Sequence, residues 1–181
     1  DNVGPKGAAL LLDGPFSGTI SNCAMYGNTA EESGGAVWCG AVTAAFSNCT
    51  IAYNGAGSGA GGIDCGSALV TIEHSIIAFS AGGAAITGPA SLVCVDLYGN
   101  AGGDWVEEIA EQYGVAGNIS ADPLFCGGAA GGLSLHEDSP CAPGANPECG
   151  LIGRLPVGCG PTPASETSWG AMKALFRGDA K

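Results

Sequence analysis

Short alternations of apolar and polar residues, separated by glycine, serine and asparagine, fill the first hundred residues. The segments AVWC (36–39), AFSNCTIAY (45–53) and VTIEHSIIAF (70–79) are rich in β-branched and aromatic residues, and each is too short for a typical helix. Alternation places every second side chain on the same face of a strand. The pattern therefore predicts an all-β fold built from many short strands.

This alternation recurs with a period of 26 residues. The octet SNCAMYGN at 21–28 returns as SNCTIAYN at 47–54, and the series continues in GGIDCGSALVTIEHSIIAFS at 61–80. A shorter copy at 84–100 fits after two three-residue deletions, both in turns. Repeats of about 20–50 residues are typical of solenoids, where each coil buries its inner face by stacking on its neighbours. We expect a parallel β-helix of about four coils across residues 1–104.

Equivalent residues of successive coils should form columns along the solenoid. The offset predicts three inward columns: Leu11, Val37, Ile63 and Ile86; Ile20, Phe46, Ile72 and Leu92; and Met25, Ile51, Ile77 and Leu97. Asn28, Asn54 and Asn100 mark a turn where side-chain amides can hydrogen-bond from coil to coil, and Ser80 interrupts that ladder. The repeat is therefore interpreted first as a feature of the fold and not as a functional motif.

The remaining chain divides into four segments. Asp104 is expected to cap a short helix near 105–113, inside a helical insertion at 105–117. Residues 118–160 should form a disulfide-bearing cap over the open end of the solenoid. PTPASETS at 161–168 is an extended linker, and it leads to an amphipathic basic tail helix at 169–181 that carries Trp169, Met172 and Phe176.

The amino-acid composition limits the classes of partner that the protein is expected to bind. The chain has 181 residues, 33 glycines, five Lys+Arg and a formal net charge of −12. Nucleic acids and anionic membranes bind basic surfaces, so neither is an expected partner. No apolar run approaches the ~18–20 residues that a membrane span needs, and no signal peptide precedes Asp1. We expect a processed form or a fragment of a secreted protein.

Nine cysteines without a CxxC motif indicate an oxidised, extracytoplasmic chain rather than a zinc protein. Cys23 and Cys49, and likewise Cys39 and Cys65, are 26 residues apart and should stack on neighbouring coils. Each pair could form a disulfide between coils or pack as free thiols. Cys126–Cys141 and Cys149–Cys159 are the favoured disulfides, because both pairs flank glycine- and proline-rich loops. Cys94 remains as the odd cysteine.

The repeat phrases GGAVWC, FSNCTIAYN and GGIDC resemble those of bacterial secreted right-handed parallel β-helix proteins, which share the pectate-lyase-like fold. The stretch GNISADPLFC…LSLHEDSPC at 117–141 is similar to the segment that closes the helix in many of them. The resemblance covers roughly residues 7–160. It implies a right-handed helix and a non-catalytic surface protein; a minority of the wider fold are polysaccharide lyases and hydrolases, so the fold alone does not give the activity.

Residues that could take part in catalysis or binding lie at the outward positions of the coils. One outward row runs Leu12, Trp38, Asp64, Thr87, and the next runs Ser21, Ser47, Glu73, Val93. No Lys or Arg occurs between Lys6 and Arg154, so the coils lack the basic residue of a lyase. His74 is interpreted as a hydrogen-bonded turn residue rather than a general base. No catalytic, cofactor-binding or metal-binding residue is predicted.

Three functional hypotheses follow. The first is a non-enzymatic extracellular module, at the cell surface or assembled from copies of itself, since no segment before Gly7 is long enough to cover the first coil. The second is a carbohydrate-active enzyme or glycan-binding module that uses Trp38, Asp64 and Glu73 along one face. The third is a partner bound through the tail by Trp169, Met172 and Phe176. We favour the first, with head-to-tail stacking into a filament or sheath as its assembled form.

Overall fold

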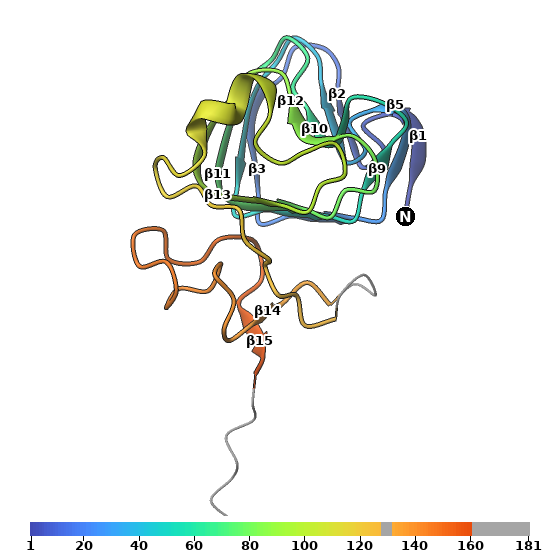
Figure 1. Ribbon diagram of the computed structural model, residues 1–181. Coiled ribbons are helices and arrows are strands. Elements are labelled where there is room, and N and C mark those ends of the chain that lie inside the picture. The colour runs from blue at the N-terminus through green and yellow to red at the C-terminus, as the bar shows by residue number, and fades with distance from the viewer. Residues whose placement is uncertain (128–131, 161–181) are drawn as a thin grey trace, which may run out of the picture.

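The computed structural model describes residues 1–127 and 132–160, and residues 1–119 form a parallel β-solenoid (Figure 1). The expectations for the linker and for Trp169, Met172 and Phe176 in the tail lie outside the described residues. The all-β prediction is confirmed, since the described chain contains one short helix and otherwise strands and turns. No helix among these residues has the length and apolarity to cross a membrane.

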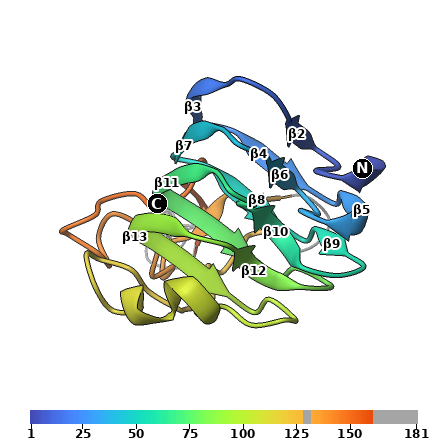
Figure 2. The same ribbon diagram turned by 90° about the horizontal axis from the view of Figure 1, so that it is seen from above.

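Three parallel sheets form the walls of the solenoid, and the chain visits them in turn (Figure 2). Sheet A contains β1 (Val3–Lys6), β5 (Thr29–Ser33) and β9 (Gly55–Ala56). Sheet B contains β2 (Leu10–Leu12), β6 (Val37–Cys39), β10 (Ala60–Asp64) and β12 (Ala84–Thr87). Sheet C contains β3 (Ser17–Ser21), β4 (Ala24–Tyr26), β7 (Thr43–Ser47), β8 (Thr50–Ala52), β11 (Leu69–Ala78) and β13 (Ala90–Tyr98).

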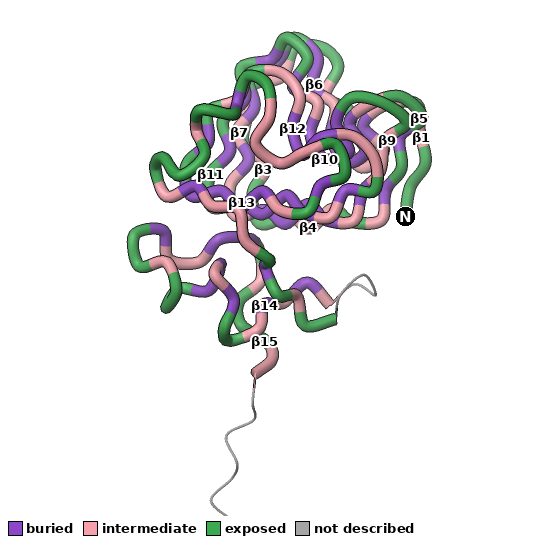
Figure 3. Tube along the Cα trace, viewed as in Figure 1, coloured by how far each residue is buried: buried purple, intermediate pink, exposed green. Residues whose placement is uncertain are grey.

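The strand register confirms the stacked columns, with one exception. Ile63 pairs with Val37 and with Ile86, Phe46 pairs with Ile20 and Ile72, and Ile72 pairs with Leu92. The third column, Met25–Ile51–Ile77–Leu97, is also in register. From the second coil onward the inward members are buried (Figure 3), and their side chains form one hydrophobic core against which Ile20 and Met25 of the first coil pack.

The assignment of Leu11 to the first inward column is wrong. Leu10 pairs with Val37 and Leu11 with Trp38, so Leu11 points outward and is 53% exposed. The offset between the first two coils is therefore 27 residues in sheet B but 26 in sheet C. A one-residue shift exchanges the two faces of a strand, and three consecutive leucines at 10–12 give no alternation from which to detect it.

The repeated SNC triplet forms the bend between the two halves of sheet C. Asn22, Asn48, His74 and Cys94 all adopt the left-handed backbone conformation there, with φ between 46° and 54°. Asparagine tolerates this region better than most residues, which explains its place in the first two coils. His74 lies at this bend inside β11 rather than in a separate turn, and its carbonyl accepts a hydrogen bond from Gly153 N–H at 2.8 Å.

Residues 103–119 cover the C-terminal end of the solenoid, a role that the sequence suggested for residues 118–160. The helix predicted for 105–113 is a 3-10 helix, η1 (Glu107–Gln112), and Ile109 from it is buried in the main core. Asp104 does not cap this helix, because the N-cap position is Val106 and no side-chain cap hydrogen bond is formed there. The carboxylate of Asp104 instead accepts from Gly99 and Asn100.

Residues 120–160 pack on the outer side of sheet C rather than over an end (Figure 1). This side segment contains β14 (Leu135–His136) and β15 (Val157–Cys159). Ile152 is buried in a second cluster with Ile76, which projects outward from β11. Arg154 donates from its main chain to Thr50 Oγ1 and from Nε to the Asn22 carbonyl, at 2.9 Å each. The segment therefore braces several coils at once.

The disulfide pairing differs from the expected one. The structure contains Cys94–Cys149 and Cys126–Cys159, while Cys141 is a free thiol. Proximity along the chain suggested Cys126–Cys141 and Cys149–Cys159, but the fold brings β13 under the side segment and pairs Cys94, the supposed odd cysteine, across that contact. Cys94–Cys149 covalently joins the solenoid to the side segment.

The two stacked cysteine pairs contain free thiols, the second of the two alternatives. Cys39, Cys49 and Cys65 are buried, and Cys23 is partly exposed. Burial, assisted by the nearby charge of Asp64, raises the pKa of Cys39 to about 11. Burial likewise raises the pKa of Cys49 and, to a larger extent, that of Cys65. These three thiols are therefore packed as small apolar groups.

Candidate functional site

The three outward residues proposed for glycan contact do not share one wall. Trp38 and Asp64 are paired neighbours on β6 and β10 of sheet B, whereas Glu73 lies on β11 of sheet C. The Lys6 ammonium lies 5.2 Å from the centroid of the Trp38 ring, which gives that ring an intramolecular cation–π partner. The outward row also starts with Leu11 rather than Leu12, because of the shifted register. The structure thus brings together two of the three residues.

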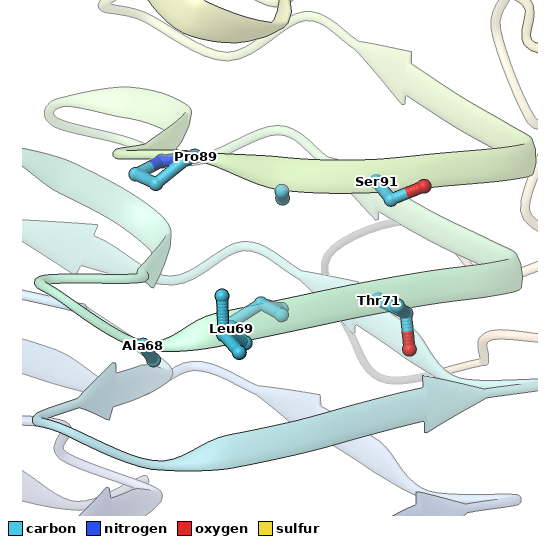
Figure 4. Close-up of a pocket in the computed structure, with 7 residues that line it drawn as sticks. Ala68, Leu69, Thr71, Pro89 and Ser91 are labelled. Carbon is cyan, nitrogen blue, oxygen red and sulfur yellow. The ribbon is translucent and has the colours of Figure 1, made fainter.

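A shallow hollow follows the corner where the chain enters sheet C. One part of it, about 310 Å³, is lined by residues 68–71 and 89–91, with Leu69 in its centre and Thr71 and Ser91 along the adjoining strands (Figure 4). Leu69 is 72% exposed and also borders a second hollow next to Pro15 and Ala41. The lining is mostly small and apolar, and it gathers no set of titratable groups.

The N-terminal end of the solenoid is the clearest unpartnered surface. Among the described residues, strands β1, β2, β3 and β4 each pair only with a strand of the next coil, so their other edges have no partner there. The start of this coil is also earlier than the predicted Gly7, because β1 already pairs with β5 from Val3 onward. Ile20 and Met25 are only partly buried, whereas Phe46 and Ile51 directly above them are 0% and 1% exposed. The described residues therefore leave the core side chains of the first coil partly uncovered.

An asparagine ladder runs along one turn of the solenoid and begins at this end. The Oδ1 atom of Asn28 accepts from Asn2 N at 3.1 Å and from Asn2 Nδ2 at 2.8 Å. Asn54 Oδ1 accepts from Asn28 N and Nδ2 at 3.0 and 2.9 Å in the same way. The predicted ladder is therefore real and includes Asn2, which a further 26-residue step back from Asn28 would have identified.

Ser80 interrupts the ladder as expected. Its hydroxyl is buried and has no hydrogen-bond partner among the described residues. The ladder resumes one coil later, where Asn100 Oδ1 accepts from Ser80 N at 3.1 Å and Asn100 Nδ2 donates to the Ile77 carbonyl at 3.0 Å. The interruption is local, and the column continues to the last coil.

At the C-terminal end the same ladder is closed by Asp104. Its Oδ1 accepts from Asn100 N at 2.9 Å and from Asn100 Nδ2 at 2.7 Å, so it occupies the position that the next asparagine oxygen would take. Oδ2 accepts from Gly99 N at 3.1 Å. Spacing alone does not reveal this role, because Asp104 is four residues, not one coil, from Asn100.

The open edge of β13 is satisfied by the covering segment. Leu92 N donates to Gln112 Oε1 at 2.9 Å, and Val95 N donates to Asn118 Oδ1 at 3.0 Å. Cys94 N and Leu97 N donate to the carbonyls of residues 116 and 119. The amides of Gln112 and Asn118 donate in return to carbonyls of the same edge region. Within the described residues the two ends of the solenoid therefore differ, because the edge of β13 is hydrogen-bonded and the edges of β1 to β4 are not.

Residues 1–127 and 132–160 contain no group of three or more His, Cys, Asp or Glu placed to hold a metal ion. Comparison with known proteins found no matching family model, no similar curated protein and no similar solved structure.

Proposed function

We propose that the protein is a non-catalytic extracellular structural or interaction module that joins another β-coil through its N-terminal end. The observation that carries this proposal is the contrast between the two ends. At the C-terminal end, Ile109 covers the core and the edge of β13 is hydrogen-bonded. At the N-terminal end, Ile20 and Met25 are partly exposed beside open strand edges. Open parallel edges next to apolar surface are sites of strand addition.

The two disulfides support an extracellular setting. Cys94–Cys149 and Cys126–Cys159 both hold the side segment, which has little core of its own. Such bonds persist in oxidising compartments. A disulfide-braced solenoid with a closed far end is suited to a rigid, protease-resistant body that presents one interaction surface.

A head-to-tail filament of identical chains is a less favourable form of this assembly. Head-to-tail contacts require that one end be complementary to the other. Here the C-terminal end has already used the main-chain donors of Leu92, Val95 and Leu97, and η1 lies over the core. We therefore place this molecule at the closed terminus of a solenoid rather than as a repeating filament subunit.

The proposal is tested by supplying the missing coil. A second copy of residues 28–53 is joined directly before Asn2 in the full chain, which keeps the 26-residue phase of sheet C and of the asparagine turn. The added coil should raise the Tm by about 5 °C or more, because it buries Ile20 and Met25 and pairs the edges of β3 and β4. An unchanged Tm, together with rapid protease cleavage of the added coil, would show that this coil stays unfolded. That result would refute end-on association.

Glycan binding is a second candidate, because an aromatic ring and a carboxylate lie side by side at Trp38 and Asp64. Such a pair can stack on a sugar ring and accept hydrogen bonds from its hydroxyls. Titration of acidic and neutral oligosaccharides into the wild type and Trp38→Ala, with and without calcium, tests this candidate. Binding that Trp38→Ala abolishes would support it; heats that are equal for the two proteins would exclude this pair as the site.

A further inference from the structure

We infer that Cys126–Cys159 is an exchangeable disulfide, which reacts with a small neutral or cationic thiol and forms a mixed disulfide at Cys126. All residues that take part lie in the side segment, so this site is independent of the end-on association proposed above. The other disulfide, Cys94–Cys149, serves as an internal reference for a bond that holds the fold together.

The two disulfides differ in their access to solvent. Cys94 and Cys149 are 6% and 7% exposed, and both lie in the apolar cluster between the solenoid and the side segment. Cys126 is exposed and Cys159 is partly exposed. Exchange begins when a thiolate reaches a sulfur atom, and exposed disulfides are therefore the labile ones. An external thiol reaches Cys126–Cys159 without opening the contact between the side segment and the solenoid.

Strand β14 lies between the two cysteines and brings His136 beside them. On one side, Cys126 N donates to the Ser134 carbonyl at 2.9 Å, and on the other side His136 of β14 pairs with Cys159 of β15 (Figure 1). Side chains of paired residues on neighbouring strands share one face. The disulfide and the imidazole accordingly line one hollow of about 350 Å³, whose lining residues are Leu124, Phe125, Cys126, His136, Asp138 and Cys159.

The surroundings of the two sulfur atoms favour attack at Cys126. Its Sγ lies 3.2 Å from the Leu135 carbonyl oxygen, so a negative charge on this sulfur would face an acceptor. A thiolate on Cys159 lies instead in the hollow that His136 lines. The incoming thiolate therefore forms its new S–S bond with Cys126, the Cys126–Cys159 bond breaks, and the electron pair leaves with the Cys159 sulfur. The proton lost by the incoming thiol is finally taken up at Cys159, and the exchange needs no further oxidant.

His136 carries an N–H donor in both of its protonation states. In the neutral ring, Nδ1 accepts from Asp138 N at 3.2 Å, which places the ring proton on Nε2. In the charged ring, Nδ1 lies 3.5 Å from Asp138 Oδ2 as an ion pair, and Nε2 is again protonated. A donor or positive charge beside the departing sulfur stabilises its thiolate, and a more stable leaving thiolate departs faster. His136 thus assists the departure of Cys159.

The charge and the size of the hollow select the thiol. Asp138 lines the hollow and the adjacent Glu137 is exposed, and within residues 1–127 and 132–160 neither carboxylate forms an ion pair with Lys or Arg. These charges repel an anionic thiol and admit a neutral or cationic one. The volume of about 350 Å³ is near the lower end of small-molecule sites, which favours a low-molecular-weight thiol over a cysteine in a polypeptide.

The experiment measures exchange in the full, oxidised chain. Cysteamine, which is cationic, and 2-mercaptoethanesulfonate, which is anionic, are added at equal thiolate concentration, and N-ethylmaleimide stops the reaction by alkylating the released thiol. Peptide mass spectrometry then locates the mixed disulfide, which we expect on Cys126. Cys126–Cys159 should exchange at least about tenfold faster than Cys94–Cys149, because the latter is buried. Cysteamine should react at least about threefold faster than the anionic thiol at low salt, and this ratio should approach one at about 1 M salt.

Two variants of His136 test its part in the exchange. His136→Phe keeps a planar ring without a donor, and His136→Gln keeps an N–H donor in a side chain that does not titrate. His136→Phe should slow the exchange with cysteamine about threefold or more, and His136→Gln should restore part of the rate. The Tm of the oxidised protein controls for a structural effect, and it should be the same for both variants.

Each remaining result would overturn a stated part of the inference. Equal exchange rates for the two disulfides, or N-ethylmaleimide labelling of the buried Cys141 at the rate of exchange, would overturn the exposed exchangeable bond. A mixed disulfide on Cys159 would overturn the direction of attack. Equal rates for wild type and His136→Phe would overturn the role of His136. Equal rates for the two thiols at low salt would overturn selection by charge, and a faster reaction of a Lys-Cys-Lys peptide than of cysteamine would overturn the small thiol as the reactant.

Discussion

Asp96 accepts a hydrogen bond from the thiol of Cys141 at 3.2 Å, in a space that solvent does not reach. Asp96 projects from β13 toward the side segment, and its other oxygen accepts from Ala121 N at 3.0 Å. No cation lies beside the carboxylate among the described residues. Burial raises the pKa of Asp96 to about 7, although the hydrogen bonds from Ala121 and Cys141 act in the opposite direction. The contact between the solenoid and the side segment therefore contains a titratable group.

The first prediction concerns the pH dependence of stability. Because the folded-state pKa of Asp96 is above its unfolded value of about 4, the folded protein binds more protons between pH 4 and 7. The contribution of Asp96 to the free energy of unfolding is thus fully favourable below pH 4 and is lost as pH rises through 7. Asp96→Asn removes this titration, so its stability relative to wild type should increase with pH, by on the order of 4 kcal/mol in total.

Urea unfolding of both proteins from pH 4 to pH 9 checks this prediction through the difference between the two curves. Asp13→Asn is the matched control, because Asp13 is exposed and makes no side-chain hydrogen bond within the described residues. The control reports the effect of replacing an exposed carboxylate, and it is subtracted at each pH. A difference for Asp96→Asn that does not change with pH would show that Asp96 does not titrate in this range.

The second prediction compares two buried serines of the same coil. The Ser80 hydroxyl has no hydrogen-bond partner in the part of the chain that the structure describes, whereas Ser75 Oγ accepts from Cys49 N at 3.0 Å and donates to the Glu73 carbonyl at 2.7 Å. Ser80→Ala should therefore be neutral or stabilise the protein by about 1 kcal/mol. Ser75→Ala should destabilise it by about 1–3 kcal/mol, because it leaves the Cys49 N–H buried and unpaired.

Chemical denaturation of both variants at one pH measures this pair, and each serves as the control for the other. Both remove one oxygen from a side chain that is at most 2% exposed. Losses of the same size would mean that the Ser80 hydroxyl has a partner that the ladder geometry does not reveal.

The sequence predicted those parts of the fold that repeat. A constant offset sets the register of Phe46 on Ile72 and of Asn28 on Asn54, since stacked coils place like residues over one another. The prediction from the constant offset failed where the 26-residue period changes or ends. Leu11 lies in a run of three leucines without alternation, and the roles of Asp104 and residues 120–160 depend on contacts that no repeat encodes.

The residues of the candidate site also fall into those that the repeat predicts and those that it does not. Asn2 could have been found from the offset, because it lies one period before Asn28. Cys94–Cys149 could not, because its two cysteines are 55 residues apart in sequence and meet only after the side segment has packed on sheet C. Non-repeating tertiary contacts are the part that local sequence patterns do not reveal.

The third prediction concerns the closed end of the ladder. Asp104→Ala removes the acceptor for Gly99 N, Asn100 N and Asn100 Nδ2 together. We expect a loss of about 2–4 kcal/mol in the free energy of unfolding, since hydrogen bonds to a charged group contribute about 1.5–3 kcal/mol each and partial rehydration offsets some of the loss. Amide exchange at residues 99 and 100 should accelerate more than exchange at Phe46.

Glu111→Ala is the control for this third prediction, because Glu111 is exposed in η1 and makes no side-chain hydrogen bond among the described residues. It should leave stability within about 0.5 kcal/mol of wild type. Exchange that accelerates equally across all coils in Asp104→Ala would indicate a general loss of stability rather than an opened end.

The fourth prediction is a map of the nine cysteines. Peptide mass spectrometry without reduction should find Cys94–Cys149 and Cys126–Cys159 and five thiols.

In the native protein at pH 8, iodoacetamide should label Cys23 first, because Cys23 is the free cysteine that is partly exposed. Cys39, Cys65 and Cys141 are buried and have raised pKa values, so both access and the thiolate fraction limit their reaction. In denaturant all five should react at similar rates. Rapid native labelling of Cys141 would mean that the side segment does not cover β13 as the structure shows, and a Cys126–Cys141 bond would contradict the packing on which the Asp96 prediction depends.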